Sequence, residues 1–132
     1  MKKAFVFIPL LALSGCALHA SFTPENSALT NAIVGKPYYA QITIAGGRVA
    51  KLTDIHGNNE FVANISPENY GLYVQHCNND EHDNNCVQVR GTPTKEGVVK
   101  IRVSGFFNVS MLDKSSDFDK TYTVHIKNPG TL

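Results

Sequence analysis

The densest group of side chains that could do chemistry lies between His76 and Cys86. Within these eleven residues there are two histidines, three carboxylates, two cysteines and four asparagines. Imidazole nitrogens and thiolates are zinc ligands, whereas carboxylate and amide oxygens suit calcium. The stretch could therefore bind a cation, or it could form a polar loop that the two cysteines close.

The spacing of these residues favours the polar loop. The D-x-D-x-D-G order of a calcium-binding loop is missing, and His76 and His82 without two thiolates would form an incomplete zinc site. We therefore expect no metal and no other cofactor. Because β-sandwiches often carry function on loops held by a rigid scaffold, we interpret the stretch as a recognition loop. Its candidate residues are His76, Asp80, Glu81, His82 and Asp83.

The N-terminal residues indicate the compartment of the protein. Lys2 and Lys3 precede an apolar run, residues 4–13, that is too short to cross a bilayer, which takes roughly 20 helical residues. The run ends in Leu13-Ser14-Gly15-Cys16, which resembles the bacterial lipobox. In proteins with this motif a peptidase cuts before the cysteine, whose thiol carries a diacylglycerol. The resemblance implies a signal peptide over residues 1–15 and lipidation of Cys16.

The residues after this motif bear on processing and sorting. An ordinary secretory signal cleaved near Ala20 is the alternative, but Leu18 is large where that cleavage pattern needs a small residue. By resemblance to enterobacterial lipoproteins, Ala17 after the cysteine, in place of Asp, implies the outer membrane, with the domain on its periplasmic or surface side. Removal of two lysines from the 12 basic residues leaves 10 against 11 acidic ones, so the lipid alone would supply the anchor.

Cys77 and Cys86 remain once Cys16 is assigned to the lipid. In an oxidising envelope compartment we expect them to form a disulfide. On the chain-entropy model, closing so short a loop stabilises the fold by roughly 2.5 to 3 kcal/mol.

Length and composition limit the classes of protein that remain. The chain has 132 residues, 42% hydrophobic and 17% charged, with 7 Phe and 5 Tyr, which indicates one globular domain rather than a disordered tail. A formal charge of +1 provides no basic surface for nucleic acid. The G-x-S-x-G and H-E-x-x-H motifs are missing from the sequence, and we expect no enzymatic activity.

Short segments of alternating hydrophobicity follow one another from Ile33 onward, each bounded by turn residues. They predict a two-sheet antiparallel sandwich of about seven strands over residues 33–128, after a flexible tether at residues 16–32 and before a tail at 129–132. Polar residues 113–119 would join the last two strands as a hairpin. The expected strands lie at Tyr38–Ile44, Arg48–Leu52, Phe61–Ile65, Leu72–Cys77, Val87–Val89, Val99–Phe107 and Tyr122–Lys127.

Five turn and strand motifs occur in a distinctive order along this domain. They are Val34-Gly35-Lys36-Pro37-Tyr38, Ala45-Gly46-Gly47, Pro67 to Gly71-Leu72, Val89-Arg90-Gly91-Thr92-Pro93-Thr94 with Gly97, and Tyr122 to Ile126. This order is similar to that of the bacterial Ig-like (cadherin-like) domains, although three residues separate Pro67 from Gly71. The resemblance implies an Ig-like all-β sandwich. We expect Gly91 to take a positive φ where it leaves a strand, in a turn and not in a phosphate-binding loop.

Together these features predict a lipid-anchored Ig-like module of the outer membrane that binds an envelope protein or a glycan, or has a structural role. Two other interpretations stay open. One is an accessory subunit or inhibitor in an envelope or secretion machine, and the other is a metal-handling lipoprotein that uses residues 76–86. No nucleic-acid partner is expected.

Overall fold

The computed structural model describes residues 19–53, 56–57, 59–108 and 117–131. The predicted signal peptide, Cys16 and Ala17 lie outside these residues, as does most of the predicted hairpin connection at 113–119. Among the residues it describes, no helix is long and apolar enough to cross a membrane.

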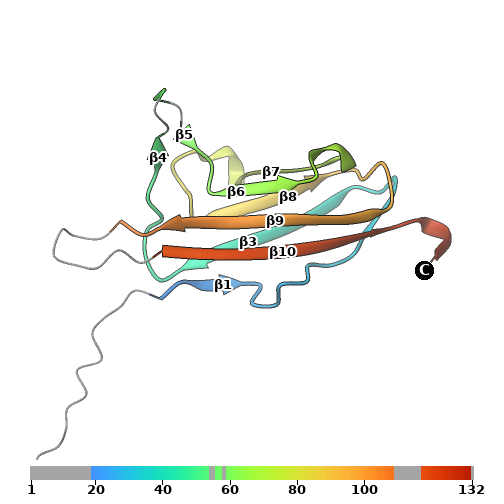
Figure 1. The fold of residues 1–132 in the computed structure, drawn as a ribbon, viewed down its shortest axis with the longest axis horizontal. Coiled ribbons are helices and arrows are strands. Elements are labelled where there is room, and N and C mark those ends of the chain that lie inside the picture. Colours follow the sequence, from blue (N-terminus) through green and yellow to red (C-terminus); the bar gives the residue numbers. More distant parts are fainter. Residues whose placement is uncertain (1–18, 54–55, 58, 109–116, 132) are drawn as a thin grey trace, which may run out of the picture.

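Two four-stranded sheets packed face to face form the body of the described chain, which confirms the predicted all-β sandwich (Figure 1). The first sheet has the order β1 (Ser21–Thr23), β3 (Tyr38–Ala45), β8 (Cys86–Gly91), β7 (Leu72–His76). The second has the order β2 (Ala32–Ile33), β10 (Asp117–Lys127), β9 (Gly97–Phe106), β6 (Ala63–Ser66). A short hairpin of β4 (Leu52–Thr53) and β5 (Asn59–Glu60) projects from this body (Figure 1).

The strand order is that of a constant-type Ig sandwich. In such domains strands A, B, E and D form one sheet and strands C, F and G form the other. Here β1-β3-β8-β7 corresponds to the first order and β6-β9-β10 to the second. The sheet neighbours are antiparallel except for β2, which pairs with β10 in parallel. The order shows an architecture, and an architecture alone does not show a function.

The core lies between the two sheets and follows the alternation seen in the sequence. On β9, Val99, Ile101 and Val103 are completely buried, and on β10 the buried residues include Tyr122 and Val124. Ile101 pairs with Tyr122 in register, and Val99 pairs with Val124. Because successive side chains on a strand point to opposite faces, this register buries one complete face of each strand.

The prediction of a flexible tether over residues 16–32 is wrong for residues 21–32. β1 pairs with β3, and Leu29 and Ala32 are buried in the core. The Leu29 amide donates to the carbonyl of Thr123, and the Tyr122 hydroxyl donates to the carbonyl of Pro24 at 2.6 Å. The segment has few apolar residues, but those few complete the interior of the sandwich.

The strand predicted at Arg48–Leu52 is also wrong in its extent. Only Leu52 falls in a strand, whereas Val49 makes an isolated bridge to Phe107. The Ala50 amide donates to the carbonyl of Phe106, so this segment crosses from the first sheet to the end of the second. The strand expected at Phe61–Ile65 begins two residues later, at Ala63.

The turns at Gly35, Gly71 and Gly91 meet at one end of the sandwich, whereas Gly46 and Gly47 lie at the other. Gly91 has a φ of 119° and Gly71 a φ of 90°, values that residues with a side chain rarely adopt. The expected positive φ of Gly91 is thus confirmed. A Cβ on Gly91 would collide with the carbonyl oxygen of Gly71. Nearby, the Gly35 amide donates to the carbonyl of Pro93 at 2.9 Å. The glycines therefore permit a close backbone approach between connections that are distant in sequence.

Tyr122→Phe tests how far the N-terminal segment belongs to the fold. Loss of the hydrogen bond to Pro24 should lower the free energy of unfolding by about 1 kcal/mol at pH 7. Burial raises the pKa of Tyr122 to about 12, above its ordinary value near 10. The stabilisation by the protonated phenol is therefore complete below pH 10 and is lost as the pH rises to 12.

Urea unfolding at pH 7 and pH 11.5 measures both effects, with the exposed Tyr73→Phe as control. The gap in stability between wild type and Tyr122→Phe should be narrower at pH 11.5 than at pH 7. A gap that stays constant or widens would contradict the assignment.

Candidate functional site

The segment between β7 and β8 is closed by a disulfide, as the sequence predicts. Cys77 and Cys86 are bonded, with their Cα atoms 5.5 Å apart. Asn78 and Asn79 have φ values of 56° and 54°, in the left-handed region that asparagine tolerates better than most residues. This preference explains why asparagine follows the first cysteine, where the chain leaves β7 in a tight turn.

Two of the carboxylates in this segment stabilise its own turns. Asp80 Oδ1 accepts a hydrogen bond of 3.0 Å from the backbone amide of His82. Asp83 Oδ1 accepts one of the same length from the amide of Asn85. Both are side-chain turns between residues two apart, which Asp forms readily. Asp80 and Asp83 are thus positioned to shape the loop.

Asn85 joins the loop to the rest of the sandwich. Its amide nitrogen donates to the carbonyls of Ile44 and Gly47, at 2.9 and 2.7 Å, and its amide oxygen accepts from the amide of Val49 at 3.0 Å. The backbone carbonyl of Asn85 also accepts a hydrogen bond from the Ile44 amide. A single side chain therefore satisfies one backbone group at the end of β3 and two in the connection that follows, which explains why that connection does not continue as a strand.

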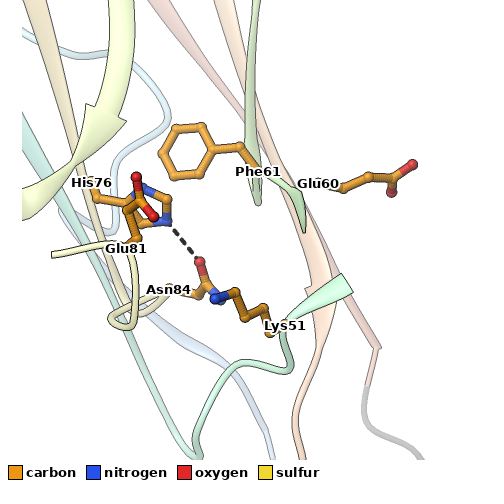
Figure 2. A pocket seen from close by; sticks show the side chains of 6 residues that line it. All are labelled: Lys51, Glu60, Phe61, His76, Glu81 and Asn84. Atoms are coloured by element: carbon orange, nitrogen blue, oxygen red, sulfur yellow. Dashed lines mark hydrogen bonds between the residues drawn. The ribbon is translucent and has the colours of Figure 1, made fainter. Parts of the chain in front are cut away.

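A pocket of about 200 Å³ lies between this loop and the β4–β5 hairpin (Figure 2). The ring of Phe61 packs on the imidazole of His76, with centroids 4.3 Å apart. His76 Nε2 donates to Asn84 Oδ1 at 2.9 Å, and Asn84 is 6% exposed. This bond leaves His76 Nδ1 without a hydrogen bond among the described residues. The lining residues are Lys51, Glu60, Phe61, His76, Glu81 and Asn84.

Charged residues of both signs line the pocket around the rings of Phe61 and His76. Lys51 and Glu81 both line the pocket, whereas Glu60 points away from the other side chains (Figure 2). Lys51 and Glu81 are exposed, so both are accessible to a ligand. The pocket combines an aromatic surface, an imidazole nitrogen without a hydrogen bond among the described residues, one cation and two carboxylates, of which Glu60 points away. Such a set can hold a small polar group by hydrogen bonds and charge.

The predicted recognition residues separate into three groups. His76 and Glu81 line the pocket, whereas Asp80 and Asp83 hold the turns beneath it. His82 is exposed and does not line the pocket. Lys51 and Phe61 were not found by sequence reasoning, because they reach the pocket only when the β4–β5 hairpin folds beside the loop. Asn84 was not singled out either, although this residue lies in the loop itself.

The metal-handling alternative finds no support in this geometry. The sulfurs of Cys77 and Cys86 are bonded to each other. Within the described ranges, no three side chains of His, Cys, Asp or Glu are grouped as a metal ion would need.

No protein-family model matches the chain, and neither a curated protein nor a solved structure matches it significantly.

Asn85→Ala tests whether this residue holds the pocket in place. The change removes three hydrogen bonds and leaves partly buried backbone groups unpaired, which should lower the free energy of unfolding by about 2 to 3 kcal/mol. Asn64→Ala, at an exposed position on β6, should change it by less than about 0.5 kcal/mol. Urea unfolding of both variants measures the difference. Equal stability of the two variants would show that the Asn85 contacts contribute nothing.

Proposed function

We propose that this protein is a non-catalytic binding module of the bacterial envelope, anchored in the outer membrane by a lipid on Cys16. Its pocket beside the disulfide-closed loop recognises a group on an envelope protein or a glycan. The observation that carries the proposal is the pocket formed by His76, Phe61 and Glu81 on a rigid frame.

The rigidity of the pocket supports a role in binding. The disulfide closes one wall, Asn85 ties that wall to the connection after β3, and Asn84 orients the imidazole. A site whose side chains are already ordered loses less conformational entropy when a ligand binds. The exposed Lys51 and Glu81 then select the ligand by charge.

The size of the pocket supports a small ligand group. Pockets for drug-sized molecules usually measure about 300 to 1,000 Å³, so a pocket of about 200 Å³ suits a single side chain or one sugar ring. A protein or glycan partner would insert one such group and use the surrounding surface for the rest of its contacts.

The topology suits an anchor at the N-terminus. β1 is at one edge of the first sheet, and β7, which leads into the pocket, is at the opposite edge. A lipid that precedes β1 would therefore lie three strands away from β7. It would lie at the same end of the sandwich as the pocket, because Ser21 pairs with Ala45 and Thr43 pairs with Cys86.

Cys16→Ser tests the lipid anchor. The variant precursor should remain uncleaved at the lipobox and incorporate no labelled palmitate, because the thiol is the group that accepts the lipid. The wild-type protein should be cleaved, labelled and recovered in the outer-membrane fraction. Normal processing of Cys16→Ser to a membrane-bound product would exclude the lipoprotein assignment.

Cross-linking in intact cells tests the pocket. Wild-type protein should cross-link to a partner, and His76→Ala and Glu81→Lys should each reduce the yield by about tenfold, the loss expected for a binding anchor. His125→Ala is the matched control, because His125 is an exposed histidine on the other sheet. A stoichiometric protein partner would favour the accessory-subunit alternative, and equal yields from all variants would remove the pocket from the proposal.

A further inference from the structure

The outward face of the first sheet has an unusual composition. We call it the tyrosine face, and it consists of the outward residues Ser21, Thr23, Tyr39, Gln41, Thr43, Ala45, Tyr73, Gln75, Gln88 and Arg90. Its only formal charge is that of Arg90, it has no carboxylate, and its largest aliphatic side chain is that of Ala45. Tyr39 and Tyr73 are 54% and 50% exposed.

The outward face of the second sheet is an ordinary solvated surface by comparison. It carries Lys100, Arg102, Asp117, Asp119 and Lys127, with threonines between the charges. Arg102 and Asp119 form an exposed ion pair at 2.6 Å. Surfaces that bind partners are enriched in Tyr and Arg and depleted in Lys, Glu and Asp, so the tyrosine face has the composition of a binding surface.

Three side chains form a row across the tyrosine face. Arg90 on β8 pairs in register with Tyr39 on β3 and with Tyr73 on β7. Two strand spacings separate the tyrosines, which is about 10 Å. The guanidinium carbon of Arg90 lies 5.0 Å from the centre of the Tyr39 ring. The row therefore presents one cation between two half-exposed aromatic rings.

Glutamine side chains next to this row form hydrogen bonds that hold Tyr39 and Arg90 in place. Gln88 is only 4% exposed, and its Oε1 accepts from Gln75 Nε2 and from Arg90 Nε, both at 3.0 Å. The hydroxyl of Tyr39 donates to Gln41 Oε1 at 3.0 Å. Both terminal nitrogens of Arg90 make no hydrogen bond to the described residues and remain as a pair of donors.

We propose that the tyrosine face binds a saccharide that carries a carboxylate. The unpaired end of Arg90 matches a carboxylate in charge and in its two parallel donors. Sugar rings have apolar C–H faces that pack on Tyr39 and Tyr73, and hydroxyl groups that pair with the Gln41 and Gln75 amides. The distance between the tyrosines is comparable with the length of two sugar rings in an extended chain.

The same features disfavour other occupants. The core of a protein interface is more apolar than the rest of the surface, and besides the two tyrosine rings this face offers no apolar side chain larger than Ala45. Two copies of the chain packed face to face would bring one Arg90 against the other. The site is on the opposite side of β7 from the pocket described above and does not depend on it.

Binding to a printed oligosaccharide array tests the proposal with full-length protein purified in detergent. The array holds oligomers that contain uronic, sialic or N-acetylmuramic acid beside neutral oligomers of glucose and N-acetylglucosamine. At least one acidic class should bind, and its neutral counterpart should bind about tenfold more weakly or less. The proposal is overturned if no acidic oligomer binds, or if acidic and neutral oligomers bind equally.

Variants then locate the binding. Arg90→Gln and Tyr73→Ala should each weaken retention by about tenfold, whereas Arg102→Gln, on the opposite outward face, should not. His76→Ala should leave retention of a disaccharide unchanged, because a ligand of two rings covers the row on the tyrosine face and does not extend to the pocket. This variant therefore separates the two surfaces. Unfolding midpoints measured in parallel show that each variant is folded. If Arg90→Gln and Tyr73→Ala still bind the acidic oligomer, the proposal is overturned. It is also overturned if a poly-glutamate peptide displaces the oligomer as well as free saccharide does, and that outcome indicates a peptide ligand.

Discussion

The burial of one face of every long strand between the two sheets is the constraint on which the rest of this structure depends. Val99, Ile101 and Val103 on β9, with Tyr122 and Val124 on β10, are entirely removed from solvent. Because the side-chain period of a strand is two, a shift of one residue would expose this whole set. The register of the core therefore also decides which side chains face outward, and both candidate binding surfaces follow from it.

A second constraint acts where the core ends. Between β7 and β8 the chain has no aliphatic side chain, and the disulfide and polar contacts hold this segment in place of apolar packing. The disulfide closes the segment on itself, but a closed loop could still rotate against the sandwich. The Asn85 amide prevents this by bonding to one backbone group at the end of β3 and to two just after it. Such a network is worth more than its separate bonds, because each partly buried group would otherwise lose a partner.

The alternation in the sequence was sufficient to predict the sandwich and its main strands, and the two cysteines left after Cys16 predicted the disulfide. The prediction failed where contacts are long-range. Residues 21–32 carry too few apolar side chains to show a hydrophobic period. Leu29 and Ala32 are nevertheless buried, because the backbone of Leu29 bonds to Thr123 and Ala32 pairs with Ile126, both on β10. Nothing local distinguishes Asn85 from the three other asparagines of its loop. Phe61 and Lys51 join the pocket through the β4–β5 hairpin, whose position depends on the complete fold.

Strand β7 connects the two candidate binding surfaces. Leu72 and His76 point toward the sandwich interior, with His76 at its margin in the pocket, while Tyr73 and Gln75 point outward to the tyrosine face. β7 is an edge strand that pairs with β8 on one side only, and the other edge of its sheet is β1. A partner that approaches the free edge can therefore reach both surfaces at once. Two weak contacts on one rigid strand combine into a stronger one, because the second forms at high effective concentration once the first is made.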